Sequence, residues 1–204
     1  MNKKEKAGLL AIFEGIDHVG KSTIVDMVRK ELTKIKRSHT QYSFPGKKTG
    51  TLGRLIYDLH HDNGNIKSEF IDNESKQILH VAAHIDTLKK DIIPDLKEGK
   101  IVLLDRSWWS TIAYGIGDGL EKETLKDIIL PEKKIIDKIK NIIYFYIIRK
   151  DIEQDFDNNK AICILQAYDE LCQSEKQYVV KVKNNDSLES VTKFIVDIIM
   201  AYNK

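Results

Sequence analysis

The sequence has few of the features that mark secreted, membrane-spanning or nucleic-acid-binding proteins. Only two of its 204 residues are cysteines, Cys163 and Cys172, and they lack metal-ligand spacing, so we expect free thiols. The longest apolar stretch, residues 142–148, is too short to span a membrane. The 33 basic residues nearly balance the 31 acidic ones, so the net charge of +2 requires neither a nucleic acid nor a membrane as partner.

Leader segments, repeats and linkers are also lacking. The basic residues 1–6 are not followed by a signal-peptide core, because the apolar run 9–13 is short, so we expect a cytoplasmic protein. No internal repeat or low-complexity linker divides the chain. A length of 204 residues with 42% hydrophobic content suffices for one α/β domain. We therefore predict a single domain over residues 1–204.

What the sequence does contain is a phosphate-binding loop. Residues 15–23 read GIDHVGKST and fit the Walker A pattern G-x-x-x-x-G-K-[ST]. Gly15 and Gly20 let the backbone turn so that its N–H groups point inward, and the helix that follows directs its positive dipole end at an anion. An apolar strand precedes the loop and apolar residues at helical spacing follow it, which is the required context. The pattern predicts a nucleoside-triphosphate site.

The residue types of this loop suit ATP and Mg²⁺. We expect the ammonium of Lys21 to reach the β- and γ-phosphates, and the hydroxyl of Ser22 to ligate Mg²⁺. The other loop residues expected to bind the cofactor are Gly15, Val19, Gly20 and Thr23.

Apolar strands alternate with amphipathic helices along the chain, which is typical of a parallel sheet with helices on both faces. The pattern predicts strands over residues 9–14, 40–44, 100–105, 141–148 and 178–182. It predicts helices over residues 21–36, 52–60, 74–97 with a bend before Pro94, 107–114, 125–139 with a break near Pro131, 151–172 and 188–202. The predicted fold class is α/β, a three-layer P-loop NTPase fold with a five-stranded parallel sheet.

Asp105 ends the strand over residues 100–105, which is the Walker B position of a P-loop protein. A carboxylate at the carboxyl end of a neighbouring strand can hold Mg²⁺ directly or through water. Such an aspartate can instead cap the next helix, but the Walker A loop favours the metal site. We predict Ser22 and Asp105 as metal ligands.

Four motifs together resemble the thymidylate kinase family of nucleoside monophosphate kinases. They are residues 13–17, residues 20–23, Phe44-Pro45-Gly46, and Asp105-Arg106-Ser107 with Ser110, Ala113 and Tyr114. The resemblance implies that Asp17 binds the sugar of an acceptor nucleotide and that Arg106 binds its phosphate. It also implies ATP and Mg²⁺ as cosubstrates, and a homodimer.

The chain departs from the family at the positions that read the base. The family generally has an aromatic residue and an arginine four positions on, whereas this chain has His80 and His84. The two histidines lie one helical turn apart, so they can stack on a base and hydrogen-bond to it, and we include them in the acceptor site. They can equally lie on the solvent side of an amphipathic helix, and as a metal pair they lack an apparent third ligand.

Arginines are scarce as well, with only five in the chain. The family has an arginine cluster in a lid after the fourth strand, whereas the short stretch here offers Arg149 alone. Some members place an arginine in the phosphate loop where this chain has His18, so His18 and Arg149 are candidate catalytic cations beside Lys21 and Arg106. Arg54 adds positive charge near the expected acceptor.

Three functions fit these residues. The breadth of the resemblance favours ATP- and Mg²⁺-dependent phosphoryl transfer to a (deoxy)nucleoside monophosphate, with an altered base site and a shortened lid. A deoxynucleoside kinase is the first alternative, since Asp105-Arg106-Ser107 is similar to its signature and Glu14 is a natural base for a 5′-hydroxyl. A nucleotide-binding regulator or pseudokinase is the second. A monophosphate needs cations more than a base, and Lys47 and Lys48 near the acceptor therefore favour the first function.

Overall fold

The sheet of this protein, seen in a computed structural model, consists of five parallel strands in the order β2-β3-β1-β4-β5. The structure describes residues 8–61, 63, 67–149, 159–175 and 177–202. The strands are β1 (Leu9–Glu14), β2 (His39–Ser43), β3 (Ile101–Asp105), β4 (Ile142–Ile148) and β5 (Tyr178–Lys183). This arrangement confirms the predicted five-stranded parallel sheet.

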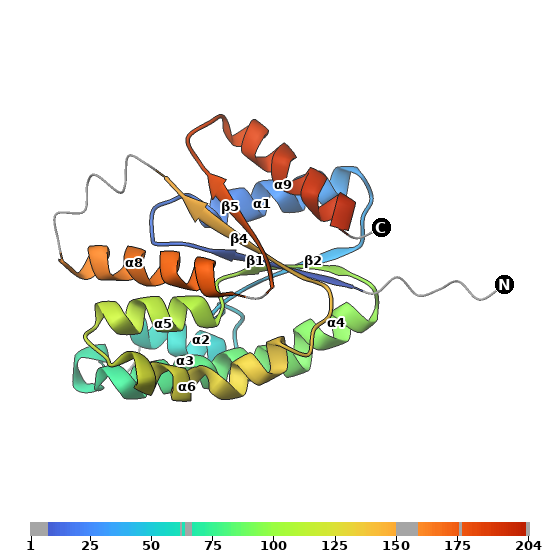
Figure 1. Cartoon of the computed structure of the whole chain (residues 1–204). Coiled ribbons are helices and arrows are strands. Elements are labelled where there is room, and N and C mark those ends of the chain that lie inside the picture. The colour runs from blue at the N-terminus through green and yellow to red at the C-terminus, as the bar shows by residue number, and fades with distance from the viewer. Residues whose placement is uncertain (1–7, 62, 64–66, 150–158, 176, 203–204) are drawn as a thin grey trace.

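Helices cover both faces of the sheet (Figure 1). One face carries α1 (Lys21–Lys34) and α9 (Leu188–Tyr202). The helices on the other side are α2 (Leu52–His60), α3 (Asn73–Thr87), α4 (Ile93–Lys97), α5 (Trp108–Gly117), α6 (Lys122–Ile136) and α8 (Asn159–Ser174). A short 3-10 helix, Ser68–Phe70, precedes α3. The predicted three-layer α/β/α architecture is thus confirmed.

The central strands are buried because they are almost continuously apolar. Every residue of β1, β3 and β4 is buried, whereas β2 and β5 at the sheet edges are partly exposed. Parallel strands covered on both faces are expected to be unbroken apolar runs. Glu14 and Asp105 are the charged residues of these three strands, and each is the last residue of its strand. The charged side chains of these strands therefore lie at the carboxyl edge of the sheet, where parallel α/β sheets bind their ligands.

Two predicted helices differ from the observed ones. In place of one helix over residues 74–97, the chain forms α3, a π-helical turn (Leu88–Ile92) and α4. Pro94 therefore lies in the first turn of α4, where its missing N–H costs nothing.

The predicted break near Pro131 is wrong, because α6 runs unbroken through it. Leu125, Ile129 and Ile136 bury one side of α6 in the core, and this packing outweighs the hydrogen bond that proline removes. Of the helix predicted over residues 151–172, residues 151–158 lie outside the described part of the chain.

The cysteines match expectation. Cys163 and Cys172 are free thiols, both half-buried on α8. Within residues 8–202, leaving out the short gaps that the structure does not describe, no helix combines the length and the apolar character that crossing a membrane requires.

Candidate active site

The phosphate loop connects β1 to α1 at the carboxyl edge of the sheet. Gly15 has a φ of 141°, and a Cβ atom there would lie 2.4 Å from the carbonyl oxygen of Ile147. Gly20 has a φ of 88°, and its Cβ atom would lie 2.6 Å from Nδ2 of Asn184. That amide donates a hydrogen bond to the carbonyl of Val19 at 2.8 Å. Gly15 is therefore required by the close backbone of β4 as well as by its φ, whereas Gly20 is favoured chiefly by its φ, because the Asn184 side chain can move.

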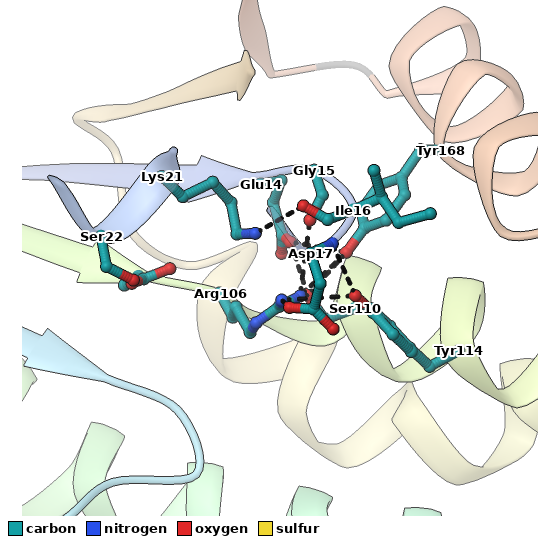
Figure 2. Close-up of polar contacts among 11 residues, drawn as sticks. Glu14, Gly15, Ile16, Asp17, Lys21, Ser22, Arg106, Ser110, Tyr114 and Tyr168 are labelled. Carbon is teal, nitrogen blue, oxygen red and sulfur yellow. Dashed lines mark hydrogen bonds and ion pairs between the residues drawn. The ribbon is translucent and has the colours of Figure 1, made fainter. Parts of the chain in front are cut away.

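Lys21 extends back into this loop. Its side chain is 5% exposed, and Nζ donates a hydrogen bond to the carbonyl of Ile16 at 2.8 Å (Figure 2). Burial, and after it the positive charge of Arg106, lowers the pKa of Lys21 to about 8. Lys21 is therefore still a cation at neutral pH, held against the backbone of the phosphate loop.

Ser22 and Asp105, the two predicted metal ligands, lie in contact. The Ser22 hydroxyl donates a hydrogen bond to Oδ2 of Asp105 at 2.6 Å, and Oδ1 of Asp105 is buried with no partner among the described residues. An unpaired buried carboxylate oxygen is unfavourable unless a cation compensates it. Mg²⁺ prefers oxygen ligands and is usually bound by one or two protein groups plus phosphates and water, so this pair fits it. The described residues contain no cluster of three or more His, Cys, Asp or Glu that could hold a metal by themselves.

Arg106 lies at the centre of the site (Figure 2). Its φ of 75° is left-handed, which costs a non-glycine residue about 1–3 kcal/mol, and its N–H donates to the carbonyl of Phe13 at 2.9 Å. Its guanidinium forms an ion pair with Asp17. It also donates to three hydroxyl groups, those of Ser110 at 3.0 Å, Tyr114 at 3.3 Å and Tyr168 at 3.4 Å. Strained backbone that is held this firmly is typical of functional sites.

Asp17 is ionised in this arrangement. Burial, the largest single effect, would raise its pKa, but the positive charges of Arg106 and Lys21 and the hydrogen bond with Tyr114 together outweigh burial and lower the pKa. The backbone N–H of Asp17 donates to the hydroxyl of Tyr114 at 3.0 Å, and the ring of Tyr114 lies 5.1 Å from the Arg106 guanidinium carbon. The Asp17 side chain is 57% exposed, so its carboxylate can still accept hydrogen bonds from a ligand.

Glu14 is fully buried and shares the Ser110 hydroxyl with Arg106 as a hydrogen-bond partner. Its carboxylate accepts hydrogen bonds of 2.7 Å from the N–H and the hydroxyl of Ser107 and from the hydroxyl of Ser110. Burial raises the pKa of Glu14 to about 7, although these hydrogen bonds oppose the rise. Glu14 is not among the described residues that line the cleft, which weighs against a role as the base of a deoxynucleoside kinase.

A cleft of about 780 Å³ opens beside these groups. It is lined by side chains from the phosphate loop, from β3 and α5, from α2 and α3, and from the connection between β2 and α2. Lys47 and Arg106 are two of its cations. Its volume lies in the range of small-molecule sites, which is about 300–1,000 Å³.

The structure places the predicted site residues in three groups. Those that line the cleft are Asp17, Ser22, His80, His84, Asp105 and Arg106. Those in the phosphate loop beside it are Gly15, Val19, Gly20, Lys21 and Thr23. His18, Arg54 and Arg149 are not among the described residues that line it. His18 is exposed on the loop, Arg149 follows β4, and Arg54 donates to its neighbour Asp58 on α2 at 2.8 Å. The rest of the lid stretch, residues 150–158, lies outside the described residues.

The two α3 histidines point inward. The alternative that they lie on a solvent face is wrong for His84, which is 3% exposed, stacks on Phe44 with 4.1 Å between ring centres, and bonds to Glu132. His80 stacks on His60 with 4.6 Å between ring centres, and their Nε2 atoms lie 2.5 Å apart. Burial holds the pKa of His80 well below its usual value, so this ring is neutral at pH 7.

Sequence reasoning missed Tyr168, Glu132 and His60. Tyr168 and His60 come from helices far from the motifs and carry no pattern of their own. Glu132 does leave a signal, since it falls on the buried stripe of α6 formed by Leu125, Ile129, Glu132 and Ile136. A carboxylate at such a position needs a polar partner.

A sequence model of the family described as Thymidylate kinase matches residues 13–195. The chain belongs to the thymidylate kinase family. The match covers the phosphate loop, Asp105-Arg106 and most of α9. It confirms the resemblance drawn from the motifs.

Relatives and solved structures agree with this assignment. The thymidylate kinase of Mesomycoplasma hyopneumoniae is 30% identical, with 93% of this chain and 95% of that protein covered. That of Neorickettsia sennetsu is 36% identical over 121 residues, which span 59% of this chain and only 57% of that protein. The crystal structure of thymidylate kinase from Ehrlichia chaffeensis matches with a TM-score of 0.72 and 20% identity, covering 95% of this chain and 99% of that one. The last match shows a shared fold.

The raised pKa of Glu14 predicts that the stability of the protein depends on pH. Its folded-state pKa lies above the ordinary value of 4.5, so its contribution to stability is fully present below pH 4.5 and is lost as the pH rises through 7. Because glutamine does not titrate, the free energy of unfolding of the wild type should fall by about 3 kcal/mol relative to Glu14→Gln between pH 4.5 and 7. Urea denaturation at a series of pH values measures this difference. Parallel curves for the two proteins would contradict it.

Proposed function

We propose that the protein transfers the γ-phosphoryl group of ATP to a (deoxy)nucleoside monophosphate in the presence of Mg²⁺. The proposal rests on one observation: two groups of residues suited to bind phosphate lie beside the same cleft. The phosphate loop with Lys21 and the Ser22–Asp105 pair suit a nucleoside triphosphate. Arg106, beside Asp17, suits the phosphate of a second nucleotide.

The chemistry requires an oxygen of the acceptor phosphate to form a bond to the γ-phosphorus while the bond to the β–γ bridging oxygen breaks, which leaves ADP. Little covalent chemistry falls to the protein in such a transfer, so its contribution is positioning and charge. In the proposed site Lys21 and the loop N–H groups bind the triphosphate, and Ser22 and Asp105 hold Mg²⁺. When bound, Mg²⁺ supplies positive charge that neutralises the phosphate oxygens.

A monophosphate acceptor fits better than a nucleoside. Arg106 and Lys47 are cations of the cleft, and an anionic acceptor phosphate would compensate their charge. Glu14 would be the base for a nucleoside hydroxyl. Its carboxylate oxygens, however, already accept hydrogen bonds from Ser107 and Ser110. Asp17, with its exposed carboxylate, is placed to accept a hydrogen bond from the acceptor sugar.

The base site and the lid differ from the family pattern in this proposal. His80 and His84 are proposed to contact the acceptor base. Phe44 provides the aromatic surface on which the His84 ring stacks. His18 and Arg149 are proposed as the cations that take part in transfer in place of lid arginines, after movement toward the bound phosphates. The homodimer, the cytoplasmic location and the lack of nucleic-acid and membrane partners stay predictions.

Lys21→Ala should abolish phosphoryl transfer without unfolding the protein. The lysine ammonium serves the phosphates, and the loop fold depends on its glycines instead. The measurement is ADP release from ATP and Mg²⁺ with a panel of nucleosides and nucleoside monophosphates. Lys30→Ala, an exposed lysine of the same helix paired with Asp26, is the matched control and should retain turnover. Turnover of a nucleoside but of no monophosphate, or equal turnover of Lys21→Ala and Lys30→Ala, would contradict the proposal.

Asp105→Asn should weaken ATP binding selectively in the presence of Mg²⁺. The variant removes the one negative charge of the Ser22–Asp105 pair, and charged hydrogen-bond partners contribute about 1.5–3 kcal/mol, so the loss should be about tenfold or more. Calorimetric titration of ATP with Mg²⁺, and of ATP with a chelator, separates the two conditions. Equal losses in both would show that Asp105 only accepts the Ser22 hydrogen bond.

A further inference from the structure

The segment that follows β5 contacts the phosphate loop. Asn184 comes directly after the last residue of β5, and its backbone N–H donates a hydrogen bond to the carbonyl of Ile148 in β4 at 2.8 Å. This bond extends the ladder between the two strands, because Ile148 is in register with Lys183. The chain then enters α9, which packs against α1 on the same face of the sheet (Figure 1). The backbone of Asn184 is therefore fixed to the sheet.

The side chain of Asn184 reaches from this fixed point to the phosphate loop. Its Nδ2 donates a hydrogen bond of 2.8 Å to the carbonyl of Val19, which is 165 positions away in sequence. A carbonyl oxygen only accepts hydrogen bonds, so the amide nitrogen of Asn184 faces Val19 and the amide oxygen does not. Gly20 permits this approach, since a Cβ atom there would lie 2.6 Å from Nδ2. Asn184 thus holds one peptide group of the phosphate loop, the one between Val19 and Gly20.

The hydrogen bond from Asn184 determines the direction of the Gly20 N–H. The peptide group between Val19 and Gly20 is planar and trans, so its C=O and its N–H point in opposite directions. Because the C=O is directed at Asn184, the N–H is directed away from it. This N–H makes no hydrogen bond to any residue that the structure describes. It is therefore available to an anion in the phosphate loop.

Gly20 does not keep this direction by itself. Its backbone angles are φ 88° and ψ 14°. Turning the preceding peptide over would make φ negative, and glycine adopts negative φ about as readily as positive φ. The turned peptide would present the Val19 carbonyl oxygen, instead of the N–H, to the oxygens of a bound phosphate. A restraint from outside the loop is therefore needed, and the Asn184 amide supplies it.

We propose that Asn184 is a positioning residue for the phosphates of the donor nucleotide. It holds the Val19–Gly20 peptide so that the Gly20 N–H donates a hydrogen bond to a phosphate oxygen. The binding of phosphate rests on the proposed function, whereas the direction of the peptide does not. A hydrogen bond from a backbone N–H to a phosphate is charge-assisted and so about twice as strong as a neutral one. Its loss affects every ligand with phosphates in the loop, whichever base that ligand carries.

NMR of the free protein tests the direction of the peptide. Val19–Gly20 is the only Val–Gly pair in the sequence, so carbonyl-carbon-13 valine and nitrogen-15 glycine together select this one peptide. Asn184→Leu removes the donor at similar size and without adding charge, and Asn185→Leu makes the same change at the exposed next residue. The carbonyl carbon signal of Val19 should move upfield in Asn184→Leu, because it loses a hydrogen bond, and should keep its position in Asn185→Leu. An unmoved signal in Asn184→Leu would overturn the proposal.

Calorimetric titrations with ATP, inorganic tripolyphosphate and dTMP test what the held peptide does. Asn184→Leu should lose about tenfold or more in affinity for both ATP and tripolyphosphate. Its affinity for dTMP should stay that of the wild type, which also shows that the variant is folded. Asn185→Leu should bind all three ligands as the wild type does.

Two results of these titrations would overturn the role of Asn184. Unchanged affinity of Asn184→Leu for tripolyphosphate would do so, because a loss confined to ATP would assign Asn184 to the nucleobase. An equal loss for all three ligands would do so as well, because the effect would then not be specific to the phosphate loop. Failure of the wild type to bind both ATP and tripolyphosphate would instead refute the proposed function, and the NMR result would still decide the direction of the peptide.

Discussion

The active site depends on one buried carboxylate, that of Glu14 at the end of β1. Three hydrogen bonds from Ser107 and Ser110 tie β1 to the start of α5. Arg106 precedes Ser107, so this attachment fixes the point from which the arginine departs and supports its left-handed backbone. Without these bonds a fully buried carboxylate would be prohibitively unfavourable. With them, the carboxylate is a rigid support for the backbone that carries the guanidinium.

The remaining groups follow from the parallel sheet. Phe13 of β1 and Ser43 of β2 are both in register with Asp105 of β3, so the chain leaves three neighbouring strands at nearly the same level. The phosphate loop, the Phe44-Pro45-Gly46 segment and Arg106 therefore emerge side by side. The alignment of strand ends brings the Ser22 hydroxyl within 2.6 Å of Asp105, although 83 positions separate them in sequence.

Features encoded locally could be predicted, and features that depend on distant partners could not. The phosphate loop is set by glycine spacing, and Asp105 by the apolar run that it ends. Arg54, which was expected near the acceptor, forms an ion pair with its i+4 neighbour Asp58 on α2. The inward direction of His84 depends on Glu132, 48 positions away, and the amphipathic pattern of α3 alone permitted either direction. The sequence also lacked a signal for Tyr168, which reaches Arg106 only because α8 lies against α5.

The central claim is that Arg106, linked to Glu14 through the Ser110 hydroxyl, forms the site for the phosphate of an acceptor nucleotide. Calorimetric titration with dTMP and with thymidine tests it most directly, because the two ligands differ only in that phosphate. Hydrogen bonds to charged groups contribute about 1.5–3 kcal/mol, so dTMP should bind about 10- to 100-fold more tightly than thymidine, and Arg106→Met should remove most of this difference. Equal affinity of the wild type for the two ligands, or a difference that persists in Arg106→Met, would contradict the account.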